Sequence, residues 1–305
     1  MLIGRTGSGL SSGPAPTPLS RTITTGMSSP FTSNPASTLV FAHANGFPAG
    51  TYRVLFDHWQ RAGWRVRAPE KFGHDPVWPV QSNWRPSRDE LIAFIEREAG
   101  GQPVQLVGHS LGGYLSLLAA CRRPDLVAGV VLLDSPVLAG WRAHSVRMIK
   151  AARLIGHVSP ARVSKRRRQH WPTAEALHQH FASKRAFARW DPRVLADYLR
   201  AGFEPDPAGG LRLAFRREIE TRFYDTLPHH LGLVLRRHPP RCPVAFIGGT
   251  QSAECRRVGL EATRRLVHDR FVWIEGSHLF PMEHPQQTAA AVLKLIGRPA
   301  SAAHA

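Results

Sequence analysis

The chain has 305 residues, of which 43% are hydrophobic and 20% charged, so it can bury one large core or two smaller ones. No apolar run approaches the roughly 20 residues that a membrane-spanning helix needs, and no membrane span is expected. The net charge of +18 suggests a nucleic-acid partner, but 35 of the 40 basic residues are arginine and only residues 164–170 form a dense basic run. A coding bias toward arginine accounts for such a charge. We therefore expect a solvated basic face and no nucleic-acid partner, while attraction to acidic substrates or anionic lipid stays open.

The three cysteines, Cys121, Cys242 and Cys255, are widely spaced and odd in number. This spacing gives neither a disulfide framework nor a metal-ligand set, so no metal and no cofactor are expected. A reducing cytoplasm is the simplest location for such a chain.

Residues 1–36 are rich in Ser, Thr, Gly and Pro, contain no acidic residue and show no hydrophobic period. This composition predicts a disordered N-terminal tail, and residues 299–305 are expected to form a disordered C-terminal tail. The longest apolar run of the N-terminal tail is too short for the core of a secretory signal. Met27 is an alternative start, and a transit peptide is a further interpretation.

Strand and helix signals alternate from residue 38 onward. Short apolar runs predict strands at residues 38–42, 104–108, 129–134, 243–248 and 271–276, and residues 64–69 (WRVRAP) resemble a further strand. An amphipathic stretch at 52–62 predicts one helix, and Ser87 and Glu90 have the spacing of a capping box that begins another, which the glycines at 100–101 end. Continuous apolar strands that alternate with helices predict an α/β fold with a parallel, doubly wound sheet covered on both faces.

The alternation stops between residues 138 and 240. This stretch has helical signals, including Asp191 as N-cap before Pro192, but few strand signals. It carries 20 Lys and Arg against 8 Asp and Glu, which is +12 of the total +18. We predict a helical cap insertion at 138–240 that divides the core into residues 37–137 and 241–298.

The insertion also holds ten aromatic residues. Such side chains more often form a small core of their own than a binding surface. The candidates for substrate contact among them are Trp171, Phe181, Trp190 and Phe203.

The stretch LVGHSLGGYL at residues 106–115 places Ser110 between an apolar strand and a helix-like run. With Gly108 and Gly112 it fits the G-x-S-x-G pattern, in which a nucleophile occupies a strained turn and its neighbours must be small. The Leu111 amide, at the start of the helix, can donate to a developing oxyanion. The alternative is a glycine-flanked serine in an ordinary strand–helix turn.

Together with HANGFPAG at 43–50 and GSHLFPMEHP at 276–285, this motif makes the chain resemble the serine-hydrolase branch of the α/β-hydrolase family. The resemblance implies the α/β-hydrolase fold and an oxyanion loop in which Phe47 supplies the second backbone N–H. His43 and Asn45 are then either substrate-binding residues or caps of the loop. Because few residues separate Met27 from the first strand, the opening antiparallel strand pair of the family is expected to be missing, which leaves about six strands.

The resemblance places the general base after the last strand, where His278 stands in a G-x-H context. His284 is expected to begin a helix. His109, inside the elbow, is expected to point along the wrong side of the turn to deprotonate Ser110.

The third member of the triad is where the sequence departs from the family pattern. Many relatives carry an aspartate a few residues after the strand at 243–248, and here Ser252 occupies that place. Asp134 ends the neighbouring strand and is our first candidate, because some relatives place the acid there. Glu254 is the second candidate, and an unforeseen acid or none remains. Asp134 could also merely cap its loop.

These residues imply hydrolysis of a carboxylic ester or thioester through an acyl-enzyme on Ser110, with a small-molecule substrate. A serine argues against the branches of the family that use an aspartate nucleophile. Cleavage of a carbon–carbon bond by the same triad is one alternative, and a ligand-binding member with little or no catalysis is another. The sequence does not define the acyl group, the alcohol or the oligomeric state.

Overall fold

The computed structural model of the protein describes residues 38–138, 164–297 and 299. The tail predicted at 1–36 lies outside the described residues, and so does nearly all of the tail predicted at 299–305. The opening antiparallel pair would precede residue 38, so its expected absence also falls outside the described part of the chain.

Among the described residues, the main sheet has six parallel strands in the order β2-β1-β3-β4-β8-β9. The strands are β1 (Thr38–Ala42), β2 (Arg65–Arg67), β3 (Val104–His109), β4 (Val127–Leu133), β8 (Val244–Gly249) and β9 (Phe271–Ile274). Each one falls on a segment that the sequence predicted to be a strand. The first described strand, β1, lies inside the sheet, and the later strands extend it toward both edges, which is the doubly wound arrangement expected from the sequence.

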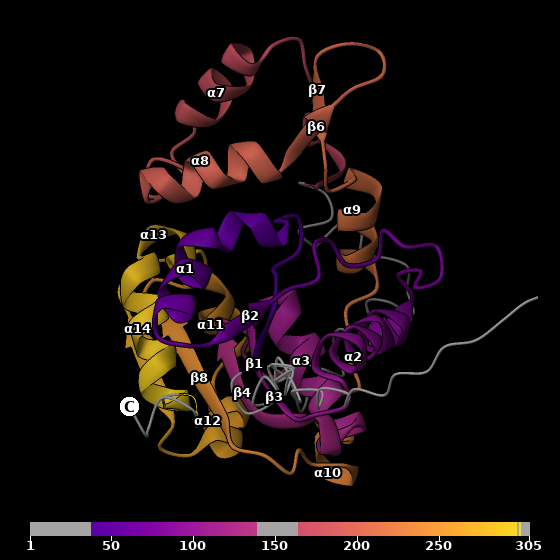
Figure 1. Ribbon diagram of the computed structural model, residues 1–305, viewed down its shortest axis with the longest axis vertical. Helices are drawn as coiled ribbons and strands as arrows, with labels where there is room; N and C mark the ends of the chain where they lie inside the picture. Colours follow the sequence, from indigo (N-terminus) through magenta and orange to yellow (C-terminus); the bar gives the residue numbers. More distant parts are fainter. Residues whose placement is uncertain (1–37, 139–163, 298, 300–305) are drawn as a thin grey trace, which may run out of the picture. The chain divides into compact units, whose positions relative to one another are not determined.

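Helices connect the strands of the core. They are α1 (Arg53–Arg61), α2 (Arg85–Ala99), α3 (Leu111–Arg122), α11 (Ala253–Val258), α12 (Glu261–Val267), α13 (Phe280–Glu283) and α14 (Pro285–Ile296), with 3-10 turns η2 (Ala49–Tyr52), η3 (Ser82–Trp84) and η4 (Pro124–Leu126). Helix α1 packs beside α14, although the two lie at opposite ends of the described chain (Figure 1).

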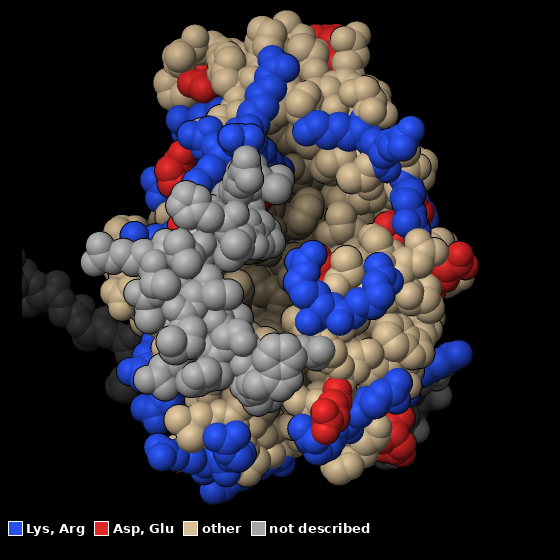
Figure 2. Space-filling view, turned by 180° about the vertical axis from the view of Figure 1, so that it is seen from behind, with Lys and Arg blue, Asp and Glu red and all other residues tan. Residues whose placement is uncertain are grey.

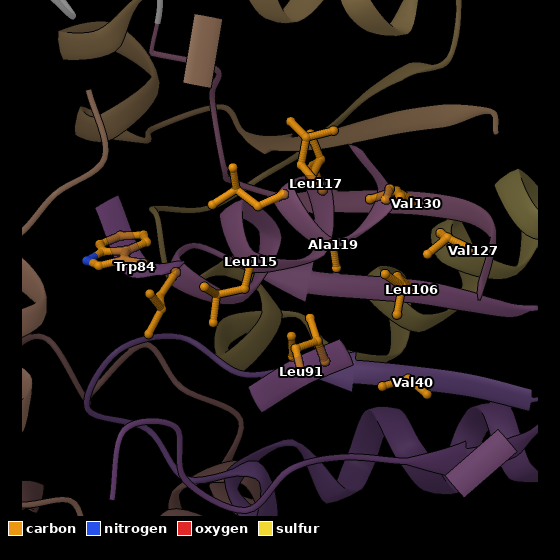
Figure 3. Close-up of a cluster of buried hydrophobic side chains, with 14 of the residues drawn as sticks. Val40, Trp84, Leu91, Leu106, Leu115, Leu117, Ala119, Val127 and Val130 are labelled. Carbon is orange, nitrogen blue, oxygen red and sulfur yellow. The ribbon is translucent and has the colours of Figure 1, made fainter. Parts of the chain in front are cut away.

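Alternate residues of each strand point to opposite faces of the sheet. On β1, Leu39 and Phe41 join the core beneath α1 and α14, while Val40 and Ala42 join the core beneath α2 and α3. Figure 3 shows the second of these cores, in which Leu91, Leu115 and other aliphatic side chains meet those of the sheet. All five residues of β1 are buried, because helices cover both faces.

Helix α2 begins two residues before the predicted capping box. Its N-cap is Trp84, and Ser87 lies inside the helix with a buried hydroxyl that has no hydrogen-bond partner among the described residues. Glu90 accepts a hydrogen bond from the Gly73 amide at 3.0 Å. The capping-box prediction was therefore wrong: Pro86 is favourable in the first turn, and Glu90 has a tertiary partner. The predicted end was correct, because Gly100 is the C-cap with φ +58°.

The insertion is not purely helical. Its described part contains helices α7 (Ala174–Ala182), α8 (Pro192–Ala201), α9 (Arg217–Asp225) and α10 (Leu231–Arg237), and strands β5 (His170–Trp171), β6 (Phe203–Pro205) and β7 (Leu211–Leu213). The strands form an antiparallel sheet in the order β5-β7-β6. Strands of two or three residues are too short to show an alternating pattern, so the sequence did not predict them. Residues 139–163 lie outside the described residues.

The predicted cap of helix α8 is present. The Asp191 side chain accepts a hydrogen bond from the Arg193 amide, and Pro192 occupies the first turn. The backbone N–H of Asp191 donates to the Met282 carbonyl of α13 at 2.9 Å, and Arg53 of α1 donates to the buried Asp197 of α8 at 2.9 Å. Helix α8 is thus tied to the core from its first turn to its middle.

Basic side chains are spread over the face of the molecule that Figure 2 shows, with tan residues between them. Several stand around a hollow in this face of the molecule. Within the described ranges, no helix is long and apolar enough to cross a membrane. The expected absence of a nucleic-acid partner and the cytoplasmic location stay predictions.

Candidate active site

Ser110 occupies a strained turn between β3 and α3. Its backbone has φ +54° and ψ −112°, which non-glycine residues seldom adopt. The flanking glycines are required by packing: a Cβ on Gly108 would strike the backbone of Gly112, and one on Gly112 would strike the carbonyl of Ala42 on the neighbouring strand. A Cβ on Gly113 would strike the Ser135 hydroxyl. The turn is therefore too tight for larger neighbours.

His278 lies in the loop between β9 and α13 and meets Ser110 from a distance of 168 residues along the chain. The Nε2 atom of His278 is 3.0 Å from Ser110 Oγ, and its Nδ1 atom is 2.7 Å from Asp134 Oδ2. Because an ionised carboxylate only accepts hydrogen bonds, Nδ1 carries a hydrogen and Nε2 is left to accept the hydroxyl hydrogen of Ser110. The structure thus brings together the three residues that the sequence singled out.

Asp134 directly follows β4 and is 1% exposed. Its backbone has φ +45°, a conformation that aspartate tolerates better than most residues. Its carboxylate accepts hydrogen bonds from the Gly249 amide at 2.8 Å and from the Ser252 hydroxyl at 2.5 Å. The Cys255 thiol lies 3.3 Å from Oδ1. Asp134 therefore does more than cap its own loop.

Glu254 is the second carboxylate near the imidazole. Its Oε2 atom lies 3.8 Å from His278 Nδ1, and its side chain is 40% exposed. It approaches Nδ1 of His278, the same nitrogen that Asp134 contacts, but from a longer distance and from the solvent-exposed side. The geometry therefore favours Asp134 as the hydrogen-bond partner of His278.

The charges of this cluster reinforce one another. Burial alone would lower the pKa of His278, but the hydrogen bond and charge of Asp134, aided by Glu254, raise the pKa above its usual value. Burial would likewise raise the pKa of Asp134, yet hydrogen bonds from His278, Ser252 and Gly249 hold it below the usual range. Asp134 therefore stays ionised at neutral pH.

His109 is not placed to act as a base for Ser110. Its ring is fully buried, and its Nε2 atom lies 2.9 Å from the carbonyl oxygen of His278. Because a carbonyl only accepts, Nε2 carries the hydrogen, and Nδ1 accepts from the Tyr52 hydroxyl at 2.8 Å. Burial, followed by the neighbouring His278, lowers the pKa of His109 to about 3, so the ring is neutral.

The same hydroxyl of Tyr52 accepts a hydrogen bond from the Ala44 amide at 3.2 Å. A chain of hydrogen bonds therefore joins the loop at 43–50, the elbow and the loop that carries His278. Sequence reasoning missed Tyr52, because no local pattern signals a contact between residues so far apart. The histidine at the second position of G-x-S-x-G is the only signal that pointed toward it.

The loop at 43–50 differs from expectation at Phe47. Gly46 has φ +82° and closes a turn in which the Phe47 N–H donates to the Ala44 carbonyl at 3.2 Å. The expectation of a free Phe47 amide is therefore wrong for this conformation. Within the described part of the chain, the amides of Asn45 and Gly46 donate to no acceptor, and the Leu111 amide donates to no carbonyl.

His43 and Asn45 stabilise the loop. The Nδ1 atom of His43 donates to the Ala44 carbonyl at 2.8 Å, and its Nε2 atom accepts from the Phe72 amide at 3.0 Å. Burial lowers the pKa of His43 to about 4, so it is neutral. Asn45 donates to the Glu220 carbonyl at 2.9 Å, which links the loop to α9. Both ring nitrogens of His43 are thus occupied, and the interpretation as a cap of the loop fits better than substrate binding.

The four aromatic candidates of the insertion lie in its core. Trp171, Phe181, Trp190 and Phe203 are 0–7% exposed. The rings of Trp171 and Phe203 are 5.0 Å apart and those of Phe181 and Phe203 are 5.3 Å apart. Their interpretation as substrate-binding residues is not supported by this packing. Trp190 alone approaches the loop at 43–50, with its ring 5.7 Å from that of Phe47.

We therefore expect the substitution Trp171→Ala to act on stability. Removing a fully buried indole leaves a cavity and should lower the free energy of unfolding by about 3–5 kcal/mol. Urea unfolding measures this loss. The matched control is Trp273→Ala, which removes an indole that is 42% exposed and should cost far less. A stable Trp171→Ala variant with an altered preference among ester chain lengths would contradict this view.

Asp134, Glu254 and His278 are also the group within the described residues whose ligand atoms lie close enough to share a metal ion. The Nδ1 atom of His278 that would bind an ion is the atom that donates to Asp134. A bound ion and the hydrogen-bonded arrangement therefore exclude each other.

Comparison with known proteins identifies the family and the fold of the chain. The sequence profile of the family described as "Alpha/beta hydrolase family" matches residues 39–291. The chain is similar to monoglyceride lipase of Rattus norvegicus, with 29% identity over 132 residues, which are 41% of this chain and 44% of the relative. Lipase LipV of Mycobacterium tuberculosis is 34% identical over 118 residues, covering 32% of this chain and 43% of the relative. The matches thus span less than half the length of these curated relatives.

Among solved structures, E-2-(acetamidomethylene)succinate hydrolase superposes with a TM-score of 0.66 at 23% sequence identity. The superposition covers 85% of this chain and 91% of that structure. At this identity the likeness concerns the fold alone.

Proposed function

Because the chain belongs to the alpha/beta hydrolase family, we propose that it hydrolyses a carboxylic ester or thioester through an acyl-enzyme on Ser110. The observation that carries the proposal is the unbroken series of hydrogen bonds from Ser110 Oγ through the imidazole of His278 to the buried carboxylate of Asp134. A strained nucleophile, a neutral base and an orienting acid are the three parts that this chemistry needs.

The proposed reaction begins at Ser110. As its oxygen attacks the carbonyl carbon, its hydrogen passes to Nε2 of His278, and the imidazolium that forms is stabilised by Asp134. His278 then gives this hydrogen to the departing alcohol or thiol, which leaves the acyl group on Ser110. A water molecule, deprotonated in turn by His278, releases the acid and restores the hydroxyl.

The negative charge on the carbonyl oxygen needs hydrogen-bond donors that are in place before the reaction. The Leu111 amide, at the start of α3, is the first donor that we propose. For the second we propose an amide of the loop at 43–50. Asn45 and Gly46 fit this role better than Phe47, whose N–H is engaged with the Ala44 carbonyl.

Two of the similar proteins are named as lipases, which favours an ester with a lipid-like acyl chain as substrate. The alternative of a ligand-binding member without catalysis drew its support from the irregular acid position. The contact of Asp134 with His278 supports the catalytic proposal instead. Among the residues that the structure describes at the site, no feature favours cleavage of a carbon–carbon bond over cleavage of an ester.

The proposal is tested by reacting the purified protein with a fluorophosphonate probe and by measuring hydrolysis of p-nitrophenyl esters from acetate to palmitate. We expect covalent labelling at Ser110 and turnover that depends on chain length. A protein that is neither labelled nor active on any of these esters would contradict the proposal. Labelling without ester turnover, combined with cleavage of a diketone, would redirect it to carbon–carbon bonds.

A further inference from the structure

Ser252 stands where the family pattern has its acid, and its hydrogen bonds have a defined direction. It is the N-cap of α11, and its hydroxyl oxygen accepts from the Cys255 amide at 3.1 Å. The ionised carboxylate of Asp134 can only accept, so the Ser252 O–H donates to Asp134 Oδ2 at 2.5 Å. Ser252 is 1% exposed, so no water competes for this contact.

The carboxylate of Asp134 is held from two sides. Its Oδ2 atom accepts hydrogen bonds from the Ser252 hydroxyl at 2.5 Å and from His278 Nδ1 at 2.7 Å. Its Oδ1 atom accepts from the Gly249 amide at 2.8 Å and faces the Cys255 thiol at 3.3 Å. A carboxylate held in this way cannot turn away from the imidazole without losing a donor.

We propose that Ser252 is a positioning residue that fixes Asp134 against His278, and that position 252 is a second place from which a carboxylate can serve the same imidazole. The catalytic consequence rests on the function proposed above. Ser252 Oγ and His278 Nδ1 both touch Asp134 Oδ2, so they are no farther apart than the sum of those two contacts. An aspartate at 252 would extend one bond farther toward the ring than serine does.

A role as helix cap alone makes a different prediction. Serine, threonine and aspartate all serve as N-caps, so a residue that only caps α11 tolerates each of them. A residue that donates to Asp134 tolerates threonine, which keeps the hydroxyl, but not aspartate, which brings a second negative charge against Oδ2. The two roles are therefore separable by substitution.

The first test compares kcat and KM of Ser252→Ala, Ser252→Thr and Ser252→Asp. We expect near wild-type kcat for threonine, and a loss of about 10- to 100-fold for alanine with little change in KM. Ser252→Asp, with Asp134 unchanged, should also impair turnover near neutral pH, because it places a second negative charge against Asp134 Oδ2. The matched control is Ser87→Ala, which removes a buried hydroxyl without a partner in the described residues and should leave kcat unchanged. Equal kcat for Ser252→Ala and Ser87→Ala would overturn the positioning role.

The second test combines Asp134→Asn with Ser252→Asp. We expect this double variant to recover at least about 10-fold in kcat over Asp134→Asn alone, because a carboxylate again accepts from His278 Nδ1. Failure to recover would overturn the second part of the proposal. Circular dichroism of each variant establishes that the fold is kept.

A third measurement does not depend on catalysis: the pKa of His278, followed by NMR of histidine-labelled protein. The groups that face its ring are Asp134, Glu254 and His109, of which His109 is neutral. Asp134→Asn should lower the pKa of His278 by removing a negative charge, and the double variant should restore it. If the wild-type protein neither labels nor hydrolyses, the proposed function fails, while this titration still decides whether position 252 reaches the imidazole. An unrestored pKa in the double variant would overturn the proposal.

Discussion

Replacing Ser110 by alanine should reduce ester turnover by about 10⁴- to 10⁶-fold and leave the protein folded. The hydroxyl performs the chemistry, and alanine introduces no atom into the tight elbow. His278→Ala should match this loss, because the members of a triad act as a unit and their losses do not add. The measurement is steady-state hydrolysis of a short p-nitrophenyl ester, with urea unfolding to verify stability.

The double variant Ser110→Ala/His278→Ala provides the control for this prediction. It should be no slower than either single variant, since one missing member already disables the other. Wild-type turnover in Ser110→Ala would remove the serine-hydrolase proposal altogether. If the loss of turnover in the double variant equals the product of the losses in the two single variants, His278 acts separately from Ser110.

The pH dependence of turnover should follow the titration of His278. The base must be neutral to accept a hydrogen, and Asp134 raises its pKa by stabilising the charged form. The activity should therefore fall on the acidic side at a higher pH than an ordinary histidine would cause. His109 contributes nothing to this profile in the working range, because burial keeps it neutral down to a pKa of about 3.

The core strands and the elbow could be predicted from the sequence because their signals are local. Buried parallel strands appear as continuous apolar runs, and the glycines around Ser110 are required by contacts within the strand–helix turn and with its neighbouring strands. The strands of the insertion were missed because two or three residues carry no period. The four candidate aromatic residues of the insertion are buried, as expected of a core, although their packing could not be derived from spacing.

The proposed acid, Asp134, shows where such inference reaches its limit. The sequence made Asp134 the first candidate because it ends a strand after which some relatives of the family place their acid. The support that it receives from Ser252 and Gly249 comes from the next strand and its loop, 115 residues or more away. Phe47 was misjudged for a similar reason, since the turn closed by Gly46 decides whether its amide is free. In both cases the missing information was a hydrogen bond that no sequence pattern signals. For Asp134 it joins residues far apart in the chain, and for Phe47 it depends on the turn at Gly46.

Tyr52 and His109 explain why three loops keep their mutual positions. Their hydrogen bonds join Ala44 of the loop at 43–50 to the backbone carbonyl of His278 through His109, the residue before Ser110. Both side chains are buried and neutral, so the link does not change with pH near neutrality. The imidazole of His278 is thus held by the charge of Asp134, and the backbone of His278 is held by hydrogen bonds between neutral groups.

Asp134→Asn should lower turnover near neutral pH by about 10⁴-fold. An asparagine amide that donates to Nδ1 of His278 favours the tautomer with hydrogen on Nε2, and that nitrogen can then no longer accept from Ser110. Stability should change much less, because asparagine also tolerates the positive φ of this position. Steady-state kinetics measures the first effect and urea unfolding the second.

Glu254→Gln is the matched control, since it also turns a carboxylate near Nδ1 into an amide. At 3.8 Å and 40% exposure, Glu254 acts on His278 mainly through its charge. Its removal should leave the maximal turnover nearly unchanged and move the acidic limb of the pH profile to lower pH, because a charge that raises the pKa of His278 is lost. Unchanged turnover in Asp134→Asn, together with a large loss of turnover in Glu254→Gln, would identify Glu254 as the acid. Full activity in both variants would mean that His278 works with Ser110 as a dyad, because no third carboxylate of the described chain contacts the imidazole.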